Sequence, residues 1–413
     1  MPESVPIDRS NESTKLLQNE GVVVEATEEA EGAVRFGLIS EADTPKGMTH
    51  YHRYHELLDE VCFAEQVGFD FWGTSEQHFL YSIAPISAPE TFYAVVAERT
   101  SRIKIRHMSI LMLAFNHPIR IAERLATLDI LSHGRVELCT ARSNSAYTLD
   151  PFGIEAGETR AQWRETLEVV VKALTDDVLE HDGKYWKITP TRLTPRLYRR
   201  ELFPVSVICS SKGTHTVAGK AGLGAITGDN YLGWEYIEEC ARLYKDAIRH
   251  PEPFAAYPVT NSLGFFVSTA NCATTQEKAI ESARHVAEGF FSICLHLFEE
   301  LAARSPDYAD LSMIRKLADK RHDLRFLMDY TPTLLLGTPD DFIEKIKRLE
   351  TMGIGEVVLR IDGFGHEQNK KAIELVGKYV IPEFLKPESI VGSKQIPQQY
   401  EELGVENTPR YLT

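Results

Sequence analysis

The chain of 413 residues carries 45 lysines and arginines against 60 aspartates and glutamates, a formal charge of −15, and 43% of its residues are hydrophobic. This is the composition of a soluble globular protein, and its charge opposes binding to nucleic acid or to an anionic membrane, which needs clustered basic residues. The sequence has no apolar run of about 18 residues, so we expect no membrane-spanning helix.

Both ends of the chain are polar. Residues 1–33 end in the acidic stretch EATEEAEGA and predict a mobile acidic arm, because few apolar groups could offset the entropy lost on ordering. Residues 386–413 are rich in proline, glutamine and glutamate and predict a C-terminal tail. The folded domain is therefore expected to span residues 34–385.

Eight short apolar runs divide this domain. Each is continuous in hydrophobicity, which is typical of parallel strands that are covered on both faces. In chain order the runs are VRFGLI (from Val34), FDFWGT (from Phe69), IKIRHMSILML (from Ile103), RVELCTA (from Arg135), PVSVIC (from Pro204), LGAIT (from Leu223), SLGFFVS (from Ser262) and EVVLRI (from Glu356).

Amphipathic helical patterns lie between the runs. One helix is predicted to begin after His117-Pro118 and to end at Gly134, which takes the C′ position. A second is predicted over residues 158–174, with an apolar stripe that includes Trp163. A third begins at Thr338, whose side chain is expected to cap it, followed by proline and two acids in the first turn.

Eight strands alternating with helices predict an α/β fold of the (β/α)₈ TIM-barrel type. An open doubly wound sheet fits the alternation too, but the first strand is not followed by GxGxxG. Some ninety residues separate the seventh strand, near Phe265, from the eighth, near Val357, and they predict a long insertion. The charged helical pattern over residues 296–330 is either a lid over the catalytic end or a helical decoration without function.

The cysteines and histidines give no metal signature. Six cysteines are scattered without a Cys-x-x-Cys pair, which favours free thiols in a reducing cytoplasm over disulfides or zinc. His50, His52 and His55 are close in sequence but lack the HExxH spacing. We therefore expect a cytoplasmic protein without a metal site.

Polar clusters follow four of the predicted strands, at the end of a barrel where functional groups lie. They are Thr74 to Phe79, Ala114 to His117, Ala141 to Asn144, and Cys209 to Thr214. Ser210, Ser211 and Thr214 open a helix, whose N-terminus attracts anions. Arg142 adds a guanidinium fork suited to phosphate. Simple helix capping by the hydroxyl residues, and an ordinary ion pair for Arg142, remain open alternatives.

The cluster after the second strand contains candidate acid–base groups. Glu76 could act as a base, as an acceptor that orients another group, or as the partner of an arginine. His78 could titrate near neutral pH, or it could be a core histidine with satisfied hydrogen bonds.

Six segments, in this order, resemble the bacterial luciferase-like flavin-dependent monooxygenase family. They are GFDFWGTSEQHF from Gly68, NHPIRIAERLATLDILSHGRVELCTARSN from Asn116, PFGIEAGETRAQWRETLEVV from Pro151, GKYW from Gly183, PVSVICSSKGTHTVAGKAGLGAI from Pro204, and GTPDDFIEKIKRL from Gly337. The resemblance implies a TIM barrel that binds reduced FMN at its mouth and forms a homodimer through the helices after strands two and three.

The resemblance also implies roles for particular residues. Arg142, Ser210, Ser211 and Thr214 would hold the FMN phosphate, with Asn144 beside them. Glu76 would lie near the isoalloxazine edge, and Ser109-Ile110 matches the place where the family often has a cis peptide beneath the flavin.

One position departs from the family pattern. The luciferase α subunit has a catalytic histidine where this chain has Gln77, so acid–base work would pass to His78, to another group or to water. We therefore take Glu76, Gln77 and His78 as the candidate catalytic residues, with Asn116 or His117 lining the same face.

The family resemblance predicts a two-component monooxygenase. A separate flavin reductase would supply FMNH₂, which reacts with O₂ to a C4a-hydroperoxyflavin that oxygenates a small organic substrate. Two alternatives stay open: a deazaflavin-dependent oxidoreductase of the same family, and a non-catalytic flavin-binding subunit. The sequence does not identify the substrate.

Overall fold

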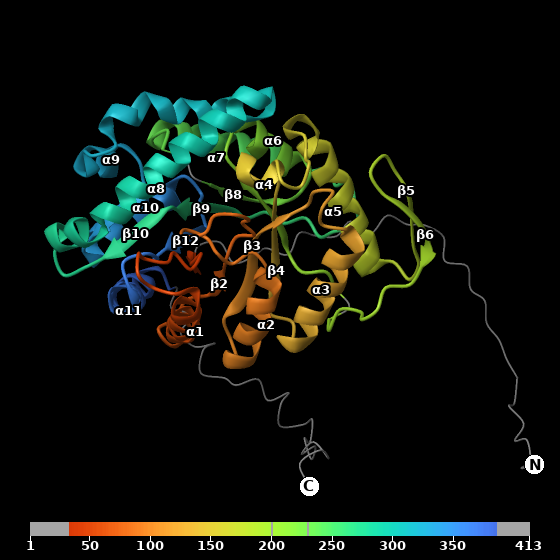
Figure 1. Cartoon of the computed structure of the whole chain (residues 1–413), viewed down its shortest axis with the longest axis horizontal. Coiled ribbons are helices and arrows are strands. Elements are labelled where there is room, and N and C mark those ends of the chain that lie inside the picture. The colour runs from red at the N-terminus through yellow and green to blue at the C-terminus, as the bar shows by residue number, and fades with distance from the viewer. Residues whose placement is uncertain (1–32, 200, 229–230, 386–413) are drawn as a thin grey trace, which may run out of the picture. The chain divides into compact units, whose positions relative to one another are not determined.

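In a computed structural model of the protein, eight parallel strands close into a barrel (Figure 1). The structure describes residues 33–199, 201–228 and 231–385. The predicted arm, apart from Ala33, and the predicted tail lie outside these residues. Around the barrel the strands run β1 (Arg35–Ile39), β2 (Phe71–Gly73), β3 (Lys104–Leu111), β4 (Val136–Ala141), β7 (Val205–Cys209), β8 (Gly224–Thr227), β9 (Leu263–Val267) and β12 (Glu356–Arg360), which pairs with β1.

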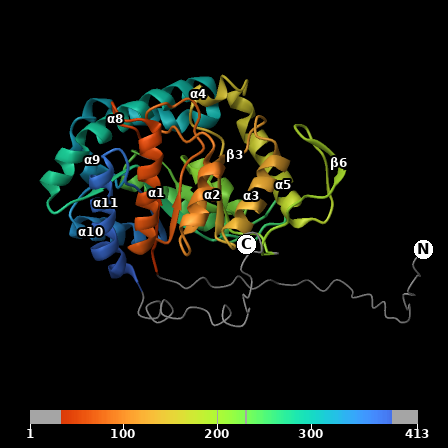
Figure 2. The ribbon, with the colours of Figure 1, turned by 60° about the horizontal axis from the view of Figure 1, so that its bottom comes forward.

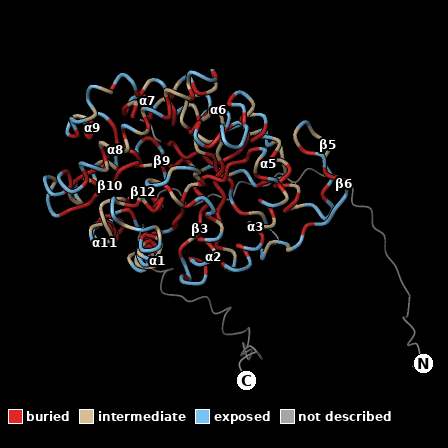
Figure 3. The backbone as a smooth tube through the Cα atoms, viewed as in Figure 1, coloured by how far each residue is buried: buried red, intermediate tan, exposed pale blue. Residues whose placement is uncertain are grey.

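These eight strands are the eight predicted apolar runs, and their chain order is their order around the barrel. The TIM-barrel prediction is therefore confirmed, and the open-sheet alternative is excluded by the pairing of β1 with β12. Figure 3 shows the strands as a buried centre surrounded by helices and loops with exposed outer faces. The runs read as continuously apolar because both faces of each strand are covered.

Helices pack around the barrel between the strands. Figure 2 shows α1, α2, α3 and α5 standing side by side on one flank. The helices before the insertion are α1 (His50–Gln66), α2 (Pro89–Arg99), α3 (Pro118–Leu131), α4 (Ala146–Leu149), α5 (Thr159–Thr175), α6 (Lys212–Lys220) and α7 (Trp234–Ile248). A hairpin of β5 (Leu179–Asp182) and β6 (Lys187–Thr191) follows α5. No helix among the described residues is long and apolar enough to cross a membrane.

The predicted insertion between β9 and β12 forms a subassembly with its own apolar core. It contains β10 (Thr269–Cys272), α8 (Gln276–Arg304), the 3₁₀ segment η2 (Pro306–Lys320), α9 (Leu324–Tyr330), β11 (Leu334–Gly337) and α10 (Pro339–Thr351), before the chain returns to β12 and α11 (His366–Leu375). Phe291, Leu301 and Ile314 are among the buried residues of this second core. Figure 2 shows α8 lying across one end of the row of flanking helices.

The predicted helix signals can be checked at their ends. Thr338 caps α10 in a reciprocal capping box with Asp341, as its sequence indicates. The predicted C′ glycine of α3 is one residue out of register. His133 takes the left-handed conformation there, with φ of +54°, and Gly134 follows at C″. The His133 N–H donates to Ile130 and the Gly134 N–H to Asp129, which is a Schellman ending.

A network of four charges, of which Arg35 is partly exposed and the other three are buried, lies at the N-terminal ends of the barrel strands. Arg106 donates to Glu137 at 2.8 Å and to Glu356 at 2.7 Å, and Arg35 donates to the same two carboxylates at 2.7 Å. Burial opposes ionisation of Glu356, but the two arginines outweigh it and lower its pKa to about 2. Two positive charges balance two negative ones, so this network can be fully ionised although three of its members are buried.

Candidate functional site

A large cavity opens at the opposite end of the barrel, where the strands have their carboxyl ends. The ends of β1, β3, β4, β7 and β9 form its floor, and α8 and η2 of the insertion cover it. Its non-atom space is about 1280 Å³, counted out to the open mouth. Part of this space is open solvent at the mouth, and the enclosed part is lined by apolar side chains with polar groups at a few places.

Seven of the residues predicted from the sequence line this cavity. They come from four different strand ends, far apart in the chain, and the barrel brings them together. They are Gln77, Ser109, Arg142, Asn144, Ser210, Ser211 and Thr214.

The N-terminus of α6 forms one side of the cavity. Ser211 caps the helix, and its hydroxyl accepts the backbone N–H of Thr214 at 3.2 Å and lies 2.8 Å from the Thr214 hydroxyl. The capping alternative is therefore realised. It is compatible with anion binding, because a helix start presents four N–H groups without an intrahelical partner, together with a positive dipole end. A Cβ on Gly213 would meet no atom closer than 3.9 Å, so the backbone is open to approach there.

The guanidinium of Arg142 lies on the cavity wall and is held only by long contacts. It is 3.4 Å from the Thr159 hydroxyl and 3.6 Å from the carboxylate of Asp307 on η2, and it lies 4.9 Å from the centre of the Tyr308 ring. Charge-assisted hydrogen bonds are shorter, about 2.7–2.9 Å. Asp307 is bound more closely by Arg160, at 3.0 Å. Burial lowers the pKa of Arg142, because the charged guanidinium loses water. An anionic ligand would take the place of that water and stabilise the charged form.

Glu76 and His78, predicted as catalytic residues, are not among the residues that line this cavity. Glu76 accepts the backbone N–H of Leu111 at 2.9 Å and the amide of Asn116 at 3.3 Å. His78 lies 3.3 Å from Glu76, with its ring edge-on to Phe115 and Phe152. The expected reacting face therefore contains Gln77 but not its two neighbours.

Glu76 borders a second, water-sized cavity between β3, α2 and α3. Ile110 and Asn116 also line it, and so does the buried ring of His107. His117, expected on the reacting face, instead caps α3 by accepting the backbone N–H of Ile119 at 3.2 Å, and its ring contacts Trp186. After β2 the side chains alternate, so Ser75 and Gln77 line the large cavity and Glu76 lies on the other side.

The peptide bond between Ser109 and Ile110 is trans, not cis as the resemblance implies; the cis bond among the described residues is Thr194–Pro195. Strand β3 has an irregular register against β4 between His107 and Ile110. Such a bulge re-aims side chains. Ser109 therefore reaches the large cavity, while the Ile110 side chain faces the smaller one.

Several residues that line the cavity were not predicted from the sequence. Glu41 lies just beyond β1 and lines the wall together with Ser75, and the rule that strand ends carry function could have identified it. The lid prediction over residues 296–330 covers Leu297 and Tyr308, which line the cavity, but the wall begins earlier, at Phe290 on α8. No group of three or more metal-binding side chains occurs among the described residues.

Comparisons with known proteins agree with this geometry. The sequence model of a family described as "Luciferase-like monooxygenase" matches residues 34–356. Limonene 1,2-monooxygenase of Rhodococcus erythropolis is 24% identical over 336 residues, which cover 80% of this chain and 81% of that protein. The oxygenating constituent of 3,6-diketocamphane monooxygenase from Pseudomonas putida, solved with FMN, superposes with a TM-score of 0.67 at 21% identity, over 86% of this chain and all of the other.

A second solved structure with the same fold uses a different cofactor. The coenzyme F420-dependent tetrahydromethanopterin reductase of Methanopyrus kandleri has a TM-score of 0.62 and 21% identity, and the match covers 86% of this chain and 100% of that chain. The fold is therefore shared by FMN and F420 proteins, and the cofactor of this chain has to be argued from its own residues.

Proposed function

Because the chain belongs to the luciferase-like monooxygenase family, whose sequence model matches residues 34–356, we propose that it is the oxygenase component of a two-component FMN-dependent monooxygenase. A separate reductase would deliver reduced FMN. The bound flavin would supply the electrons that activate O₂ for insertion of one oxygen atom into a small organic substrate. The residues of this chain bind the cofactor, orient the substrate and exclude water.

The anion-binding end of the cavity carries this proposal. Arg142, at the end of β4, faces the start of α6, where Ser210, Ser211 and Thr214 expose hydroxyl and backbone N–H groups. A phosphate monoester is a dianion that accepts several hydrogen bonds, and it fits a helix start with an adjacent guanidinium. The long contacts of Arg142 to Thr159 and Asp307 leave this guanidinium able to form shorter ones with a ligand.

The rest of the cavity is suited to the flavin ring and the substrate. Ser109 and Met108 of β3 and Ile208 of β7 present a floor on which a planar ring can lie. Phe290 and Leu297 of α8 cover it from the insertion. These apolar side chains would limit the access of bulk water to the reacting atoms, which a flavin monooxygenase requires to avoid wasting its activated oxygen.

Gln77 is the member of the predicted catalytic trio that lines the cavity. Its amide can donate and accept hydrogen bonds, but it does not titrate. We propose that it orients flavin or substrate. Glu76 and His78 would then act from behind the wall, through the Leu111 backbone that Glu76 holds.

Partners and assembly belong to the same proposal. We expect a transient reductase and a homodimer formed through α2 and α3 in the cytoplasm. Val95 on α2 and Ile130 and Leu131 on α3 are exposed apolar side chains of these two helices, which a partner subunit could cover. Sedimentation of the purified protein tests the dimer.

One assay separates this function from the two alternatives. The purified protein is mixed with FMN, a flavin reductase, NADH and O₂, and product formation from a panel of neutral organic substrates is followed by mass spectrometry with ¹⁸O₂. We expect one ¹⁸O atom in the product. Turnover only with reduced deazaflavin and without O₂ would support the F420 alternative, and flavin binding without any product would support a non-catalytic subunit.

A further inference from the structure

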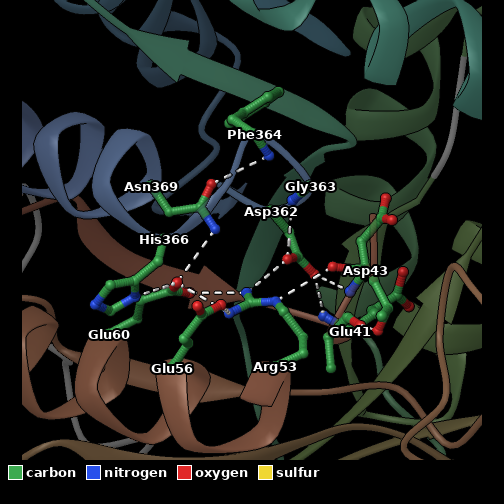
Figure 4. Close-up of polar contacts among 12 residues, drawn as sticks. Glu41, Asp43, Arg53, Glu56, Glu60, Asp362, Gly363, Phe364, His366 and Asn369 are labelled. Atoms are coloured by element: carbon green, nitrogen blue, oxygen red, sulfur yellow. Dashed lines mark hydrogen bonds and ion pairs between the residues drawn. The ribbon is translucent and has the colours of Figure 1, made fainter. Parts of the chain in front are cut away.

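A second cluster of buried charges lies beyond the carboxyl ends of β1 and β12. Figure 4 shows Arg53 of α1 at its centre, between Glu60 of the same helix and Asp362 of the loop after β12. Arg53 donates to both carboxylate oxygens of Glu60 at 2.9 Å and to Asp362 at 2.8 Å. Asp362 also accepts the backbone N–H groups of Glu41 at 2.7 Å and Asp43 at 3.1 Å. The loop after β1 is thereby fixed to the end of β12.

Arg360, the last residue of β12, is the second guanidinium of the cluster and is fully buried. It donates to Asp43 at 3.2 Å, lies 3.4 Å from Glu41, and is covered by the ring of Phe290 at 4.5 Å. Its Nε and Nη1 atoms have no hydrogen-bond partner among the described residues. The contact with Glu41 is therefore an ion-pair distance without a formed hydrogen bond.

Negative groups outnumber positive ones in this cluster. Its two guanidiniums share four carboxyl groups, those of Glu41, Asp43, Glu60 and Asp362, and Arg53 also lies 3.8 Å from a fifth, that of Glu56. The ring of His366 lies 3.1 Å from Glu60. In the balanced network at the other end of the barrel, two arginines face two glutamates. Since a buried carboxylate without compensation is strongly unfavourable, the excess is removed by protonation of one or more of the four.

The pKa values of these carboxyl groups are shifted in different directions. Asp362 has a lowered pKa, because Arg53 and Arg360 outweigh its burial, and Glu60 is bound by both Nη atoms of Arg53. Burial raises the pKa of Asp43 to about 6. Burial also raises the pKa of Glu41, opposed by Arg360 and by the Ser75 hydroxyl and reinforced by Asp362. Burial raises the pKa of Glu60 as well, and of the three carboxyls with a raised pKa Glu41 is the one that lines the large cavity.

The cavity around Glu41 is apolar. Leu80, Ile83 and Ala84 follow β2, and Phe290, Ile293 and Leu297 belong to α8. The polar groups beside Glu41 are the Ser75 hydroxyl and the Arg360 guanidinium, and Gln77 also lines the cavity. A molecule held here would therefore have an apolar skeleton and meet its polar contacts at one place.

We propose that Glu41 contacts the substrate in this cavity: its carboxyl group, in the protonated form, donates a hydrogen bond to an oxygen atom, such as a carbonyl oxygen, of an otherwise apolar molecule. The proposal rests on the proposed function, because it takes the cavity as the reaction chamber. It names the substrate class as neutral, apolar and oxygen-bearing, and it excludes a cationic substrate, which would require the ionised carboxylate.

A matched pair of probes tests this. Cyclooctanone labelled with ¹³C at the carbonyl and methylenecyclooctane have the same shape, but only the ketone accepts a hydrogen bond. Binding to the full chain is measured by NMR titration between pH 5 and pH 9, with cyclooctylamine as the cationic probe. We expect the ketone to bind about three- to tenfold more tightly than the hydrocarbon at low pH, with a ¹³C shift typical of a hydrogen-bonded carbonyl. This advantage should decline as the pH rises and Glu41 ionises.

Three variants locate the effect. Glu41→Ala should remove the advantage of the ketone and leave hydrocarbon binding unchanged. Glu41→Gln keeps an N–H donor of similar shape, so it should keep ketone binding and lose the pH dependence. Asp43→Asn is the control, because it changes the same cluster without lining the cavity, and it should keep the preference for the ketone. Thermal unfolding shows whether each variant is folded.

The outcomes separate the two proposals. Retention of the ketone preference in Glu41→Ala, retention of the wild-type pH profile in Glu41→Gln, or tighter binding of the amine than of the ketone would each overturn the role of Glu41. So would a failure of the ketone to bind wild-type protein that binds FMN normally. A failure of the wild-type protein to bind FMN would instead count against the proposed function.

Discussion

Replacement of Arg142 by alanine is the most direct test of the phosphate site. The guanidinium has only contacts of 3.4 Å and 3.6 Å to protein groups, so its main hydrogen-bonding capacity is free for a ligand. A hydrogen bond to a charged group contributes about 1.5–3 kcal/mol, and the substitution should therefore weaken FMN binding by about ten- to a hundredfold. Because the lost contacts of Arg142 within the protein are long, we expect little change in stability.

Riboflavin is the control ligand, since it shares the ring and ribityl chain of FMN but lacks the phosphate. Fluorescence titration with oxidised flavin, and anaerobic titration with reduced flavin, should give an Arg142→Ala variant with weakened FMN affinity and unchanged riboflavin affinity. Arg142→Lys should have an FMN affinity between those of the wild-type protein and Arg142→Ala, because lysine keeps the positive charge but lacks the two parallel N–H donors of the guanidinium. An equal loss for both ligands would show that Arg142 acts through the fold and not on the phosphate, and an unchanged FMN affinity would refute the site altogether.

Four further predictions follow from the charges and caps. Asp307→Asn should tighten FMN binding by about 0.5–1 kcal/mol in the same titration, because it removes a carboxylate 3.6 Å from Arg142. Glu356→Ala should lower the free energy of unfolding in urea by about 3–5 kcal/mol, since it leaves Arg106 and Arg35 with Glu137 as their one shared carboxylate and a positive charge uncompensated. Thr338→Ala should cost about 1 kcal/mol through loss of the α10 cap, and an unchanged urea midpoint would contradict this. The shift of the Asp43 pKa from 3.8 to about 6 should make the protein less stable as pH rises between these values, by up to about 3 kcal/mol, because only the unfolded chain is ionised there. Asp43→Asn should flatten that part of the pH–stability curve, as followed by thermal unfolding.

The barrel was predictable because its strands carry a signal that does not depend on distant neighbours. A strand buried on both faces reads as a continuous apolar run, and all eight runs became barrel strands. The cap of α10 was equally local, because Thr338 and Asp341 are three residues apart. The end of α3 was harder, since His133 and Gly134 can both adopt a positive φ and the choice depends on the hydrogen bonds of the last turn.

The site was predictable only in part, because the direction of a side chain depends on contacts with residues far away in the sequence. The anion-binding end could be identified from the residues at two strand ends, and both sets line one cavity. The sequence does not show which side chains of residues 75–78 face that cavity. The direction of Glu76 is decided by a hydrogen bond from the backbone of Leu111, thirty-five residues away. Sequence spacing likewise did not show that Phe290, on the early part of α8, would cover Arg360 of β12.

The two buried charge clusters suggest why the acid-rich one lies at the mouth. A fully ionised cluster there would place uncompensated carboxylates in the same cavity as a phosphate dianion, and the repulsion would weaken cofactor binding. Protonation of Glu41 removes this conflict and converts the carboxyl into a hydrogen-bond donor. The two events should then be linked: the pKa of Glu41, already raised by burial, should rise further when FMN is bound. By reciprocity, FMN binding to the wild-type protein should weaken as the pH rises and Glu41 ionises, and Glu41→Gln, which stays neutral, should lack this component. Comparing FMN titrations of the two proteins across pH measures that coupling without any substrate. If the FMN affinities of the two proteins changed with pH in parallel, the charge of Glu41 would not affect binding at the phosphate site.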